Sequence, residues 1–176
     1  MKSPSCSLFV AAVLNCVFVT TAFAAPTAPV TPRTAVQAGC DGQDKAAATK
    51  DITAFMSFRA PDFSARDADN SPISRIQARK NMVTLFAAAT HISGTTVIQT
   101  FTLKAGKAYI TAKEHDNVVT TDPDNQQTIT LVDDEIDTEV WCKVGGTWKE
   151  ETERVVSEKH SMQPGSQLDA APGQSA

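Results

Sequence analysis

The chain is poor in the residues that build transition-metal sites. It has only three histidines, and no two of them form an HxH or HxxxH pair; no CxxC motif occurs either. Because zinc and iron sites depend on clustered imidazole and thiolate ligands, we predict no metal site and no cofactor. The acidic stretch that starts at Asp67 also fails as a calcium loop, since its sixth and twelfth positions hold Pro72 and Ala78 instead of glycine and glutamate.

Basic residues are in the minority. Sixteen lysines and arginines stand against 20 aspartates and glutamates, for a formal net charge of −4. With this balance the chain lacks the positive patch that nucleic-acid-binding domains need. It also lacks a basic amphipathic stretch of the kind that binds to membrane surfaces. We therefore predict no nucleic-acid partner.

Long apolar runs are missing beyond the N-terminus. Residues 8–19, "LFVAAVLNCVFV", form a run too short to span a bilayer, which takes about 20 residues. Lys2 precedes this run and the small residues of "AFA" (22–24) follow it, a pattern typical of a secretory signal peptide. We predict cleavage after Ala24, a periplasmic or secreted location, and no membrane association after cleavage.

Two of the four cysteines lie within the predicted signal peptide, which leaves Cys40 and Cys142. In an oxidising compartment two remaining cysteines commonly pair, so we predict a disulfide between them. Two separate buried thiols are the alternative, because the sequence cannot place the two Cα atoms within bonding reach.

Composition divides the rest of the chain. Residues 25–39 are rich in proline, alanine and threonine and are predicted to form a flexible leader, and 161–176 a disordered tail. The folded domain is predicted over 40–160, as a single unit.

The first half of this domain has helical periodicity. One helix is predicted over 43–59 and ends before Pro61. A second is predicted after "NSPIS", with Ser71 as its cap and Pro72 at its first position. Its predicted apolar stripe consists of Ile73, Ile76, Val83 and Phe86.

The second half alternates with a period of two, which is typical of strands. Residues 95–116 read as two strands joined at Ala105-Gly106, followed by strands over 127–144 and 147–158 that reverse at Gly145-Gly146. Helices followed by antiparallel strands predict an α+β fold with the helices on one face of the sheet.

The order of these motifs resembles a known family. The link "APDF" (60–63), the loop "ARDADNSPISR" (65–75) and the hairpin "VWCKVGGTWKEETERV" (140–155) are similar to the nuclear transport factor 2-like (NTF2-like) superfamily, and in particular to its SnoaL-like and DUF4440-type bacterial branch. The resemblance covers residues 43–157. It implies a cone-shaped, cystatin-like fold with a pocket at the open end, and pairing of two copies through the sheet.

The resemblance also implies a candidate catalytic residue, since Asp67 stands at the offset of the general-base aspartate of ketosteroid isomerase. A polar turn is the alternative role for this residue. The predicted first helix lacks the tyrosine with which that enzyme stabilises its enolate, so steroid isomerisation is not expected.

A pocket in this fold predicts a set of ligand-lining residues. The candidates are the larger aromatic side chains and one histidine: Phe58, Phe63, Phe86, His91, Tyr109, Trp141 and Trp148. For the two tryptophans, a closed core and a dimer contact are the alternatives. The leading functional hypothesis is a secreted protein that binds a small, partly apolar molecule. A proton-transfer enzyme of the isomerase, cyclase or dehydratase type is the second, and a non-catalytic dimerising module the third.

Overall fold

The computed structural model describes residues 30–121 and 126–164. The predicted signal peptide, residues 25–29 and residues 165–176 lie outside this range. Three helices and six strands follow one another as α1 (Pro32–Ala48), α2 (Ile52–Ser57), β1 (Arg59–Arg66), β2 (Pro72–Ser74), α3 (Arg75–Ala88), β3 (Ala89–Lys104), β4 (Lys107–Thr121), β5 (Thr128–Val144) and β6 (Thr147–Pro164). Among the described residues, no helix is long and apolar enough to cross a membrane.

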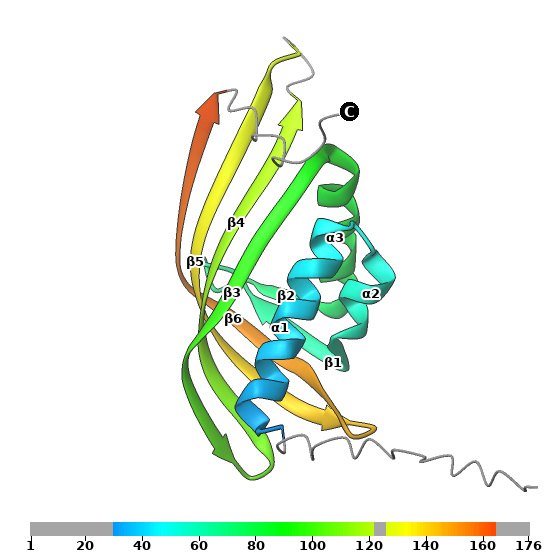
Figure 1. Cartoon of the computed structure of the whole chain (residues 1–176), viewed down its shortest axis with the longest axis vertical. Coiled ribbons are helices and arrows are strands. Elements are labelled where there is room, and N and C mark those ends of the chain that lie inside the picture. The colour runs from blue at the N-terminus through cyan, green and yellow to red at the C-terminus, as the bar shows by residue number, and fades with distance from the viewer. Residues whose placement is uncertain (1–29, 122–125, 165–176) are drawn as a thin grey trace, which may run out of the picture.

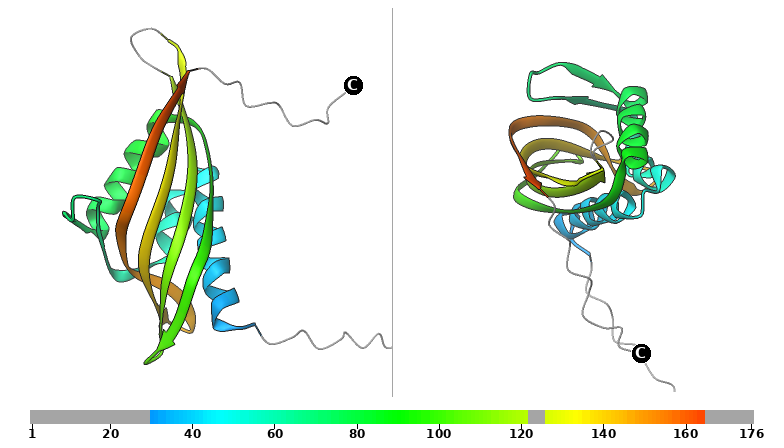
Figure 2. Two further views of the ribbon diagram at one scale, coloured as in Figure 1. Left: turned by 90° about the vertical axis from the view of Figure 1, so that its left-hand side faces the viewer. Right: turned by 90° about the horizontal axis from the view of Figure 1, so that it is seen from above.

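The strands form one sheet in the order β2-β1-β6-β5-β4-β3. All neighbours are antiparallel except β1 and β6, which run parallel. The long strands curve strongly, and all three helices lie on one side of them (Figures 1 and 2). We call the helix-covered side the inner face and the opposite side the outer face. The predicted α+β fold is confirmed.

The predicted flexible leader over 25–39 is wrong where it overlaps α1. This helix starts at Pro32, and the hydroxyl of Thr31 caps it by accepting from the backbone N–H of Thr34. Val36 and Cys40 on α1 are fully buried against the sheet. Tertiary packing therefore stabilises a helix in a segment whose composition alone indicates a linker.

The predicted helix over 43–59 is two helices. α1 ends at Ala48, Lys50 adopts a positive φ of 54°, and the carboxylate of Asp51 caps α2. Pro61 lies within strand β1 instead of ending a helix.

The second predicted helix begins later than expected and packs partly through other residues. Its cap is Ser74, because residues 72–74 form the short strand β2. Within the predicted apolar stripe Phe86 is buried as expected, but Ile76 is 81% exposed and Val83 is 42% exposed. Ala78, outside that stripe, is the other buried residue of α3.

The hairpins at Ala105-Gly106 and Gly145-Gly146 are confirmed; β3, β4 and β6 are longer than predicted, and β5 begins one residue later than predicted. β6 runs to Pro164, so the first residues of the predicted disordered tail belong to the sheet.

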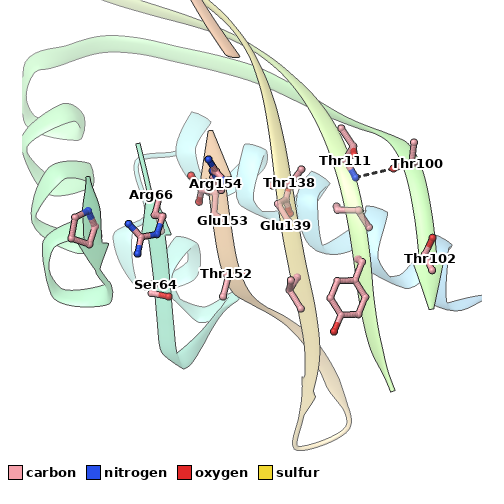
Figure 3. A pocket seen from close by; sticks show the side chains of 15 residues that line it. Ser64, Arg66, Thr100, Thr102, Thr111, Thr138, Glu139, Thr152, Glu153 and Arg154 are labelled. Atoms are coloured by element: carbon pink, nitrogen blue, oxygen red, sulfur yellow. Dashed lines mark hydrogen bonds between the residues drawn. The ribbon is translucent and has the colours of Figure 1, made fainter. Parts of the chain in front are cut away.

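A bulge in β6 changes which side chains face inward. Trp141 pairs with Glu150, but Val140 pairs with Thr152, so Glu151 is an extra residue. The sequence pattern placed Trp148, Glu150, Thr152, Arg154 and Val156 on one face. In the structure Trp148 and Glu150 are buried on the inner face, whereas Thr152 and Arg154 line the outer face (Figure 3).

Candidate functional site

A cavity of about 180 Å³ lies between the helices and the inner face of the sheet. We call it the inner cavity. One part of its lining is apolar and comes from all three helices and two strands: Ala47, Phe55, Met82, Leu85, Ile92 and Val118. The other part is acidic and contains six carboxyl groups: Asp44, Glu114, Asp116, Glu139, Glu150 and Glu153. Among the described residues, Arg59 is the one basic residue in this lining.

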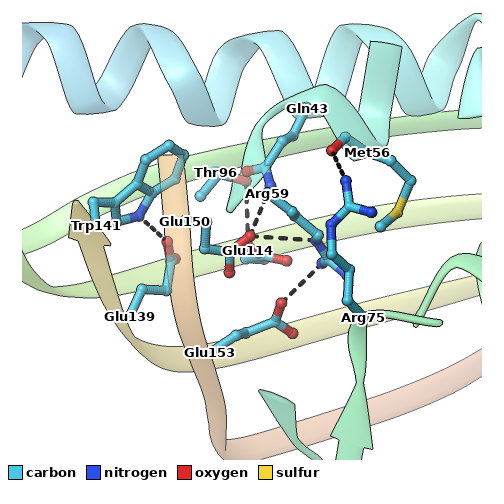
Figure 4. Close-up of polar contacts among 10 residues, drawn as sticks. All are labelled: Gln43, Met56, Arg59, Arg75, Thr96, Glu114, Glu139, Trp141, Glu150 and Glu153. Carbon is cyan, nitrogen blue, oxygen red and sulfur yellow. Dashed lines mark hydrogen bonds and ion pairs between the residues drawn. The ribbon is translucent and has the colours of Figure 1, made fainter. Parts of the chain in front are cut away.

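The guanidinium of Arg59 is already paired. Its Nε lies 3.4 Å from Glu150, and its Nη2 lies 2.9 Å from Glu153 (Figure 4). The group also stacks over the rings of Phe55 and Phe63, at 4.9 and 4.2 Å from their centroids. Two acidic side chains and two aromatic rings therefore fix the side chain of this arginine at the start of β1.

Neutral donors also bind two of the carboxylates, those of Glu150 and Asp44. Nε2 of Gln43 donates to Glu150 at 2.8 Å. Both carboxylate oxygens of Asp44 accept from Thr96, one from its backbone N–H and one from its hydroxyl. These donors orient the acidic side chains and add no positive charge.

Glu139 is oriented by a neighbour on its own strand. The indole nitrogen of Trp141 donates to Oε2 of Glu139 at 2.5 Å, and Oε1 is buried and has no hydrogen-bond partner among the described residues (Figure 4). Glu139 is only 4% exposed. An accepting oxygen is thus held free at the cavity wall.

Burial and mutual repulsion raise the pKa values of several of these acids. The pKa of Glu150 and that of Glu114 lie well above their ordinary value, first because burial disfavours the charged form and then because of the nearby Glu153. The same causes, led by burial, raise the pKa of Glu139 to about 7. Burial and the neighbouring Asp44 raise the pKa of Asp116 to about 6.

The outer face carries a larger and more open groove of about 610 Å³. Its lining includes several hydroxyl side chains, that of Tyr109 among them, and two arginines, Arg66 on β1 and Arg154 on β6 (Figure 3). It is the face through which the family resemblance implies pairing of two copies.

The structure places Asp67 in the polar turn that was its alternative role. Its carboxylate accepts from the backbone N–H of Ser71 at 2.7 Å, and its backbone pairs with Ser71 and Asn70. It lines neither the inner cavity nor the outer groove. Asp67 is therefore not positioned as a base for a ligand in the inner cavity.

None of the seven predicted ligand residues lines the inner cavity. Trp141 and Trp148 belong to the core beneath α1, as the closed-core alternative expected. Phe63 is buried under Arg59, and Phe86 packs edge-on against Phe55.

The other three lie at or near the surface. The ring of Phe58 packs against Gly42, His91 is exposed, and Tyr109 belongs to the outer groove. The lining prediction fails for the inner cavity because most aromatic side chains fill the core and the carboxylates were overlooked. The segment "EIDTEVW" (135–141) does carry a signal, since acidic residues recur there at every second position.

The predicted disulfide is also wrong, because Cys40 and Cys142 are free thiols. Cys40 is buried beneath the inner face on α1. Trp141 points to that same face, so the next residue, Cys142, points outward. The sheet therefore separates the two sulfur atoms.

Comparison with solved structures places this architecture among known folds. A conserved protein from Planctomyces limnophilus superposes with a TM-score of 0.60 at 12% identity, over 70% of this chain and 95% of that one. A protein named as a dehydratase of the NTF2-like family, from Streptomyces avermitilis, gives 0.59 at 14% identity, over 72% and 97%. The fold is NTF2-like. A hexachlorocyclohexane dehydrochlorinase (LinA) of type 2 shares it, with a TM-score of 0.56 at 12% identity over 80% and 93%.

Sequence comparisons add nothing to this assignment. No family model matches the chain, and no curated protein matches it. The NTF2-like likeness that the motifs indicate is thus confirmed at the level of the fold, and the SnoaL-like or DUF4440-type branch stays a prediction.

Proposed function

We propose that the inner cavity binds a small, partly apolar molecule that carries a cationic group, such as an alkyl or aryl amine. One observation carries this proposal: six carboxyl groups line the cavity against a single guanidinium, which is already paired with two of them. Buried acidic groups that outnumber their cationic partners favour a positively charged ligand, because an opposite charge offsets the cost of their desolvation.

The apolar part of the lining supports a ligand that is not a bare cation. Phe55, Leu85 and Ile92 lie opposite the carboxylates and offer surface for a hydrocarbon portion. A cavity of about 180 Å³ suits a molecule of few heavy atoms. One neighbour of the same fold is named for its action on hexachlorocyclohexane, itself a small organic molecule.

The structure bears differently on the other hypotheses, which concern proton transfer, secretion and pairing of two copies. The proton-transfer hypothesis relied on Asp67, which lies outside the cavity, so we do not adopt it. Secretion into the periplasm or medium remains a proposal that rests on the N-terminal sequence. Pairing of two copies through the sheet remains a proposal that rests on the family resemblance.

Isothermal titration calorimetry tests the amine proposal directly. The protein is titrated with benzylamine and hexylamine, and with benzyl alcohol and hexanoate as neutral and anionic counterparts. The buffer is phosphate with EDTA and without Tris, so that no buffer amine or metal ion competes. We expect saturable one-to-one binding of an amine and at least tenfold weaker binding of the alcohol, about 1.4 kcal/mol.

Variants then locate the site. Glu150→Gln and Glu139→Gln remove one charge each and are expected to weaken amine binding about tenfold, since hydrogen bonds to charged groups contribute roughly 1.5–3 kcal/mol. Asp134→Asn is the matched control, because Asp134 lies on β5 beside the exposed His115. Equal affinity for amine and alcohol, or equal loss in the control, would overturn the proposal.

A further inference from the structure

A second group of acidic side chains lies on the inner face of the sheet, next to the cavity. Glu114 on β4 pairs in register with Glu135 on β5, and Ala112 pairs with Asp137. Alternation along a strand places Glu135 and Asp137 on the same face. One carboxylate oxygen from each of Glu114, Glu135 and Asp137 lies within 4.8 Å of the other two.

This cluster also contains a buried oxygen without a partner. Asp137 is only 1% exposed, and its Oδ1 has no hydrogen-bond partner among the described residues. Two residues along the same strand and face, the buried Oε1 of Glu139 is likewise without a partner. Leaving a buried carboxyl oxygen unsatisfied costs more than the gain from a typical hydrogen bond, so this arrangement points to a ligand that supplies positive charge.

No residue in the described part of the chain supplies a cation to the cluster. No ion pair within residues 30–121 and 126–164 involves Glu114, Glu135 or Asp137. Arg59 is held by Glu150 and Glu153 instead.

We propose that Glu114, Glu135 and Asp137 form a binding site for one hard divalent cation of the Ca²⁺ or Mn²⁺ type. Such ions take carboxylate oxygens, at about 2.3–2.6 Å in the case of Ca²⁺, so two oxygens on one ion lie at most about 5 Å apart. Oxygen atoms within 4.8 Å of one another satisfy this limit.

The site differs from the zinc, iron and EF-hand sites that the sequence excludes. It contains no histidine or cysteine, and its ligands come from two adjacent strands and not from one loop. Spacing along the chain does not identify it, because Glu114 and Glu135 meet only through strand pairing. Only Glu114 also lines the inner cavity, so this inference does not depend on amine binding.

Metal titration of the full-length protein tests the site. Protein stripped with EDTA and dialysed is titrated with Ca²⁺ and separately with Mn²⁺, by calorimetry and by electron paramagnetic resonance of free Mn²⁺. Melting temperature is recorded with and without each ion. We expect one saturable site and a melting temperature that rises with ion concentration, since a ligand that binds only the folded state stabilises it.

Two variants and one control distinguish ligation from a general charge effect. Asp137→Asn and Glu135→Gln are each expected to weaken ion binding at least tenfold and to reduce the rise in melting temperature. Without the ion, both variants should be as stable as the parent protein or more so, because a repelling charge is removed. Asp134→Asn is expected to leave ion affinity unchanged, since its side chain pairs with exposed His115.

Two results would overturn the inference. The first is no saturable binding of either ion at millimolar concentration. The second is equal weakening by Asp134→Asn and Asp137→Asn, which would mean diffuse attraction of ions to an acidic protein. Glu150→Gln separates this site from the amine site, because it should weaken amine binding and change ion affinity less than threefold.

Discussion

The indole of Trp141 holds the carboxylate of Glu139 through a hydrogen bond between two residues of the same strand face. Trp141 is fully buried and fills the core beneath α1, while Glu139 lines the inner cavity. One side chain therefore belongs to the core and also positions a group of the candidate site. This relationship links the stability of the fold to the geometry of the cavity.

The hydrogen bond from Trp141 should be measurable by a double-mutant cycle. Trp141→Phe removes the donor and leaves a buried carboxylate oxygen without its partner, so we expect a loss of about 1–3 kcal/mol beyond the cost of the smaller ring. In the Glu139→Gln background the same change should cost less. Urea unfolding of the four proteins measures the coupling energy, and a value near zero would contradict the role of this contact.

Gly39 on α1 allows the helix to approach Trp141. A Cβ at this position would lie 2.6 Å from Cζ3 of the indole, closer than side chains tolerate. Helix propensity alone predicts that Gly39→Ala stabilises the protein by about 1 kcal/mol. We expect the opposite sign, a loss of about 1–3 kcal/mol, because overpacking displaces the ring.

The exposed Ala38 offers the control for that change. Ala38→Gly should cost only the propensity difference of about 1 kcal/mol. A gain of stability in Gly39→Ala, measured by thermal or urea unfolding, would show that α1 shifts without cost.

Arg59 neutralises part of the acidic lining, and its loss should be severe. Arg59→Met leaves Glu150 and Glu153 without their guanidinium partner, and breaking a buried ion pair on one side costs about 3–5 kcal/mol. Arg59→Lys should cost less, since it keeps the charge but loses the planar fork. Arg66→Met, at an exposed position on the same strand, should change the free energy of unfolding by less than about 0.5 kcal/mol.

Stability should fall as the pH rises above the ordinary range of carboxyl groups. Burial, followed by the charge of Glu153, raises the pKa of Glu150 in the folded protein. A raised folded-state pKa means that the folded state binds protons more tightly than the unfolded chain. This contribution is fully present below the unfolded pKa of about 4.3 and is lost as the pH rises through the folded pKa.

Scanning calorimetry between pH 5 and pH 8 checks this expectation. The melting temperature of the metal-free protein should decrease toward pH 8, and Glu150→Gln should reduce that slope, because glutamine keeps the hydrogen-bonding shape without an ionisable proton. A slope that is unchanged in Glu150→Gln would assign the pH dependence to other groups.

The turn positions were readable from the sequence because their backbone chemistry is local. Gly106, Gly145 and Gly146 adopt positive φ values, which glycine reaches without steric cost. The alternation of Ala108, Ile110 and Ala112 on β4 also held, and all three are buried. The prediction of helical segments followed by four long strands came from such local patterns, whereas the NTF2-like fold was implied by the resemblance of the motifs to that family.

On other strands, bulges interrupt this alternation of inward- and outward-facing residues. On β3 the register shifts between Ile98 and Thr100, so Val97 is exposed while Phe101, four residues further on, packs against the core, although even spacing along a strand predicts a shared face. One extra residue reverses the face of every residue beyond it. The local sequence carries little sign of where such a residue is inserted.

The sequence by itself determined the four long strands, the two tight hairpins and the α+β fold, because propensity and turn chemistry act over a few residues. Only the tertiary structure decided that Thr31 begins a helix, that Cys40 and Cys142 lie on opposite sides of a sheet, and that acidic residues from several strands and a helix line one cavity. These features depend on strand pairing and helix packing between residues far apart in the chain, where burial and electrostatics outweigh local preference.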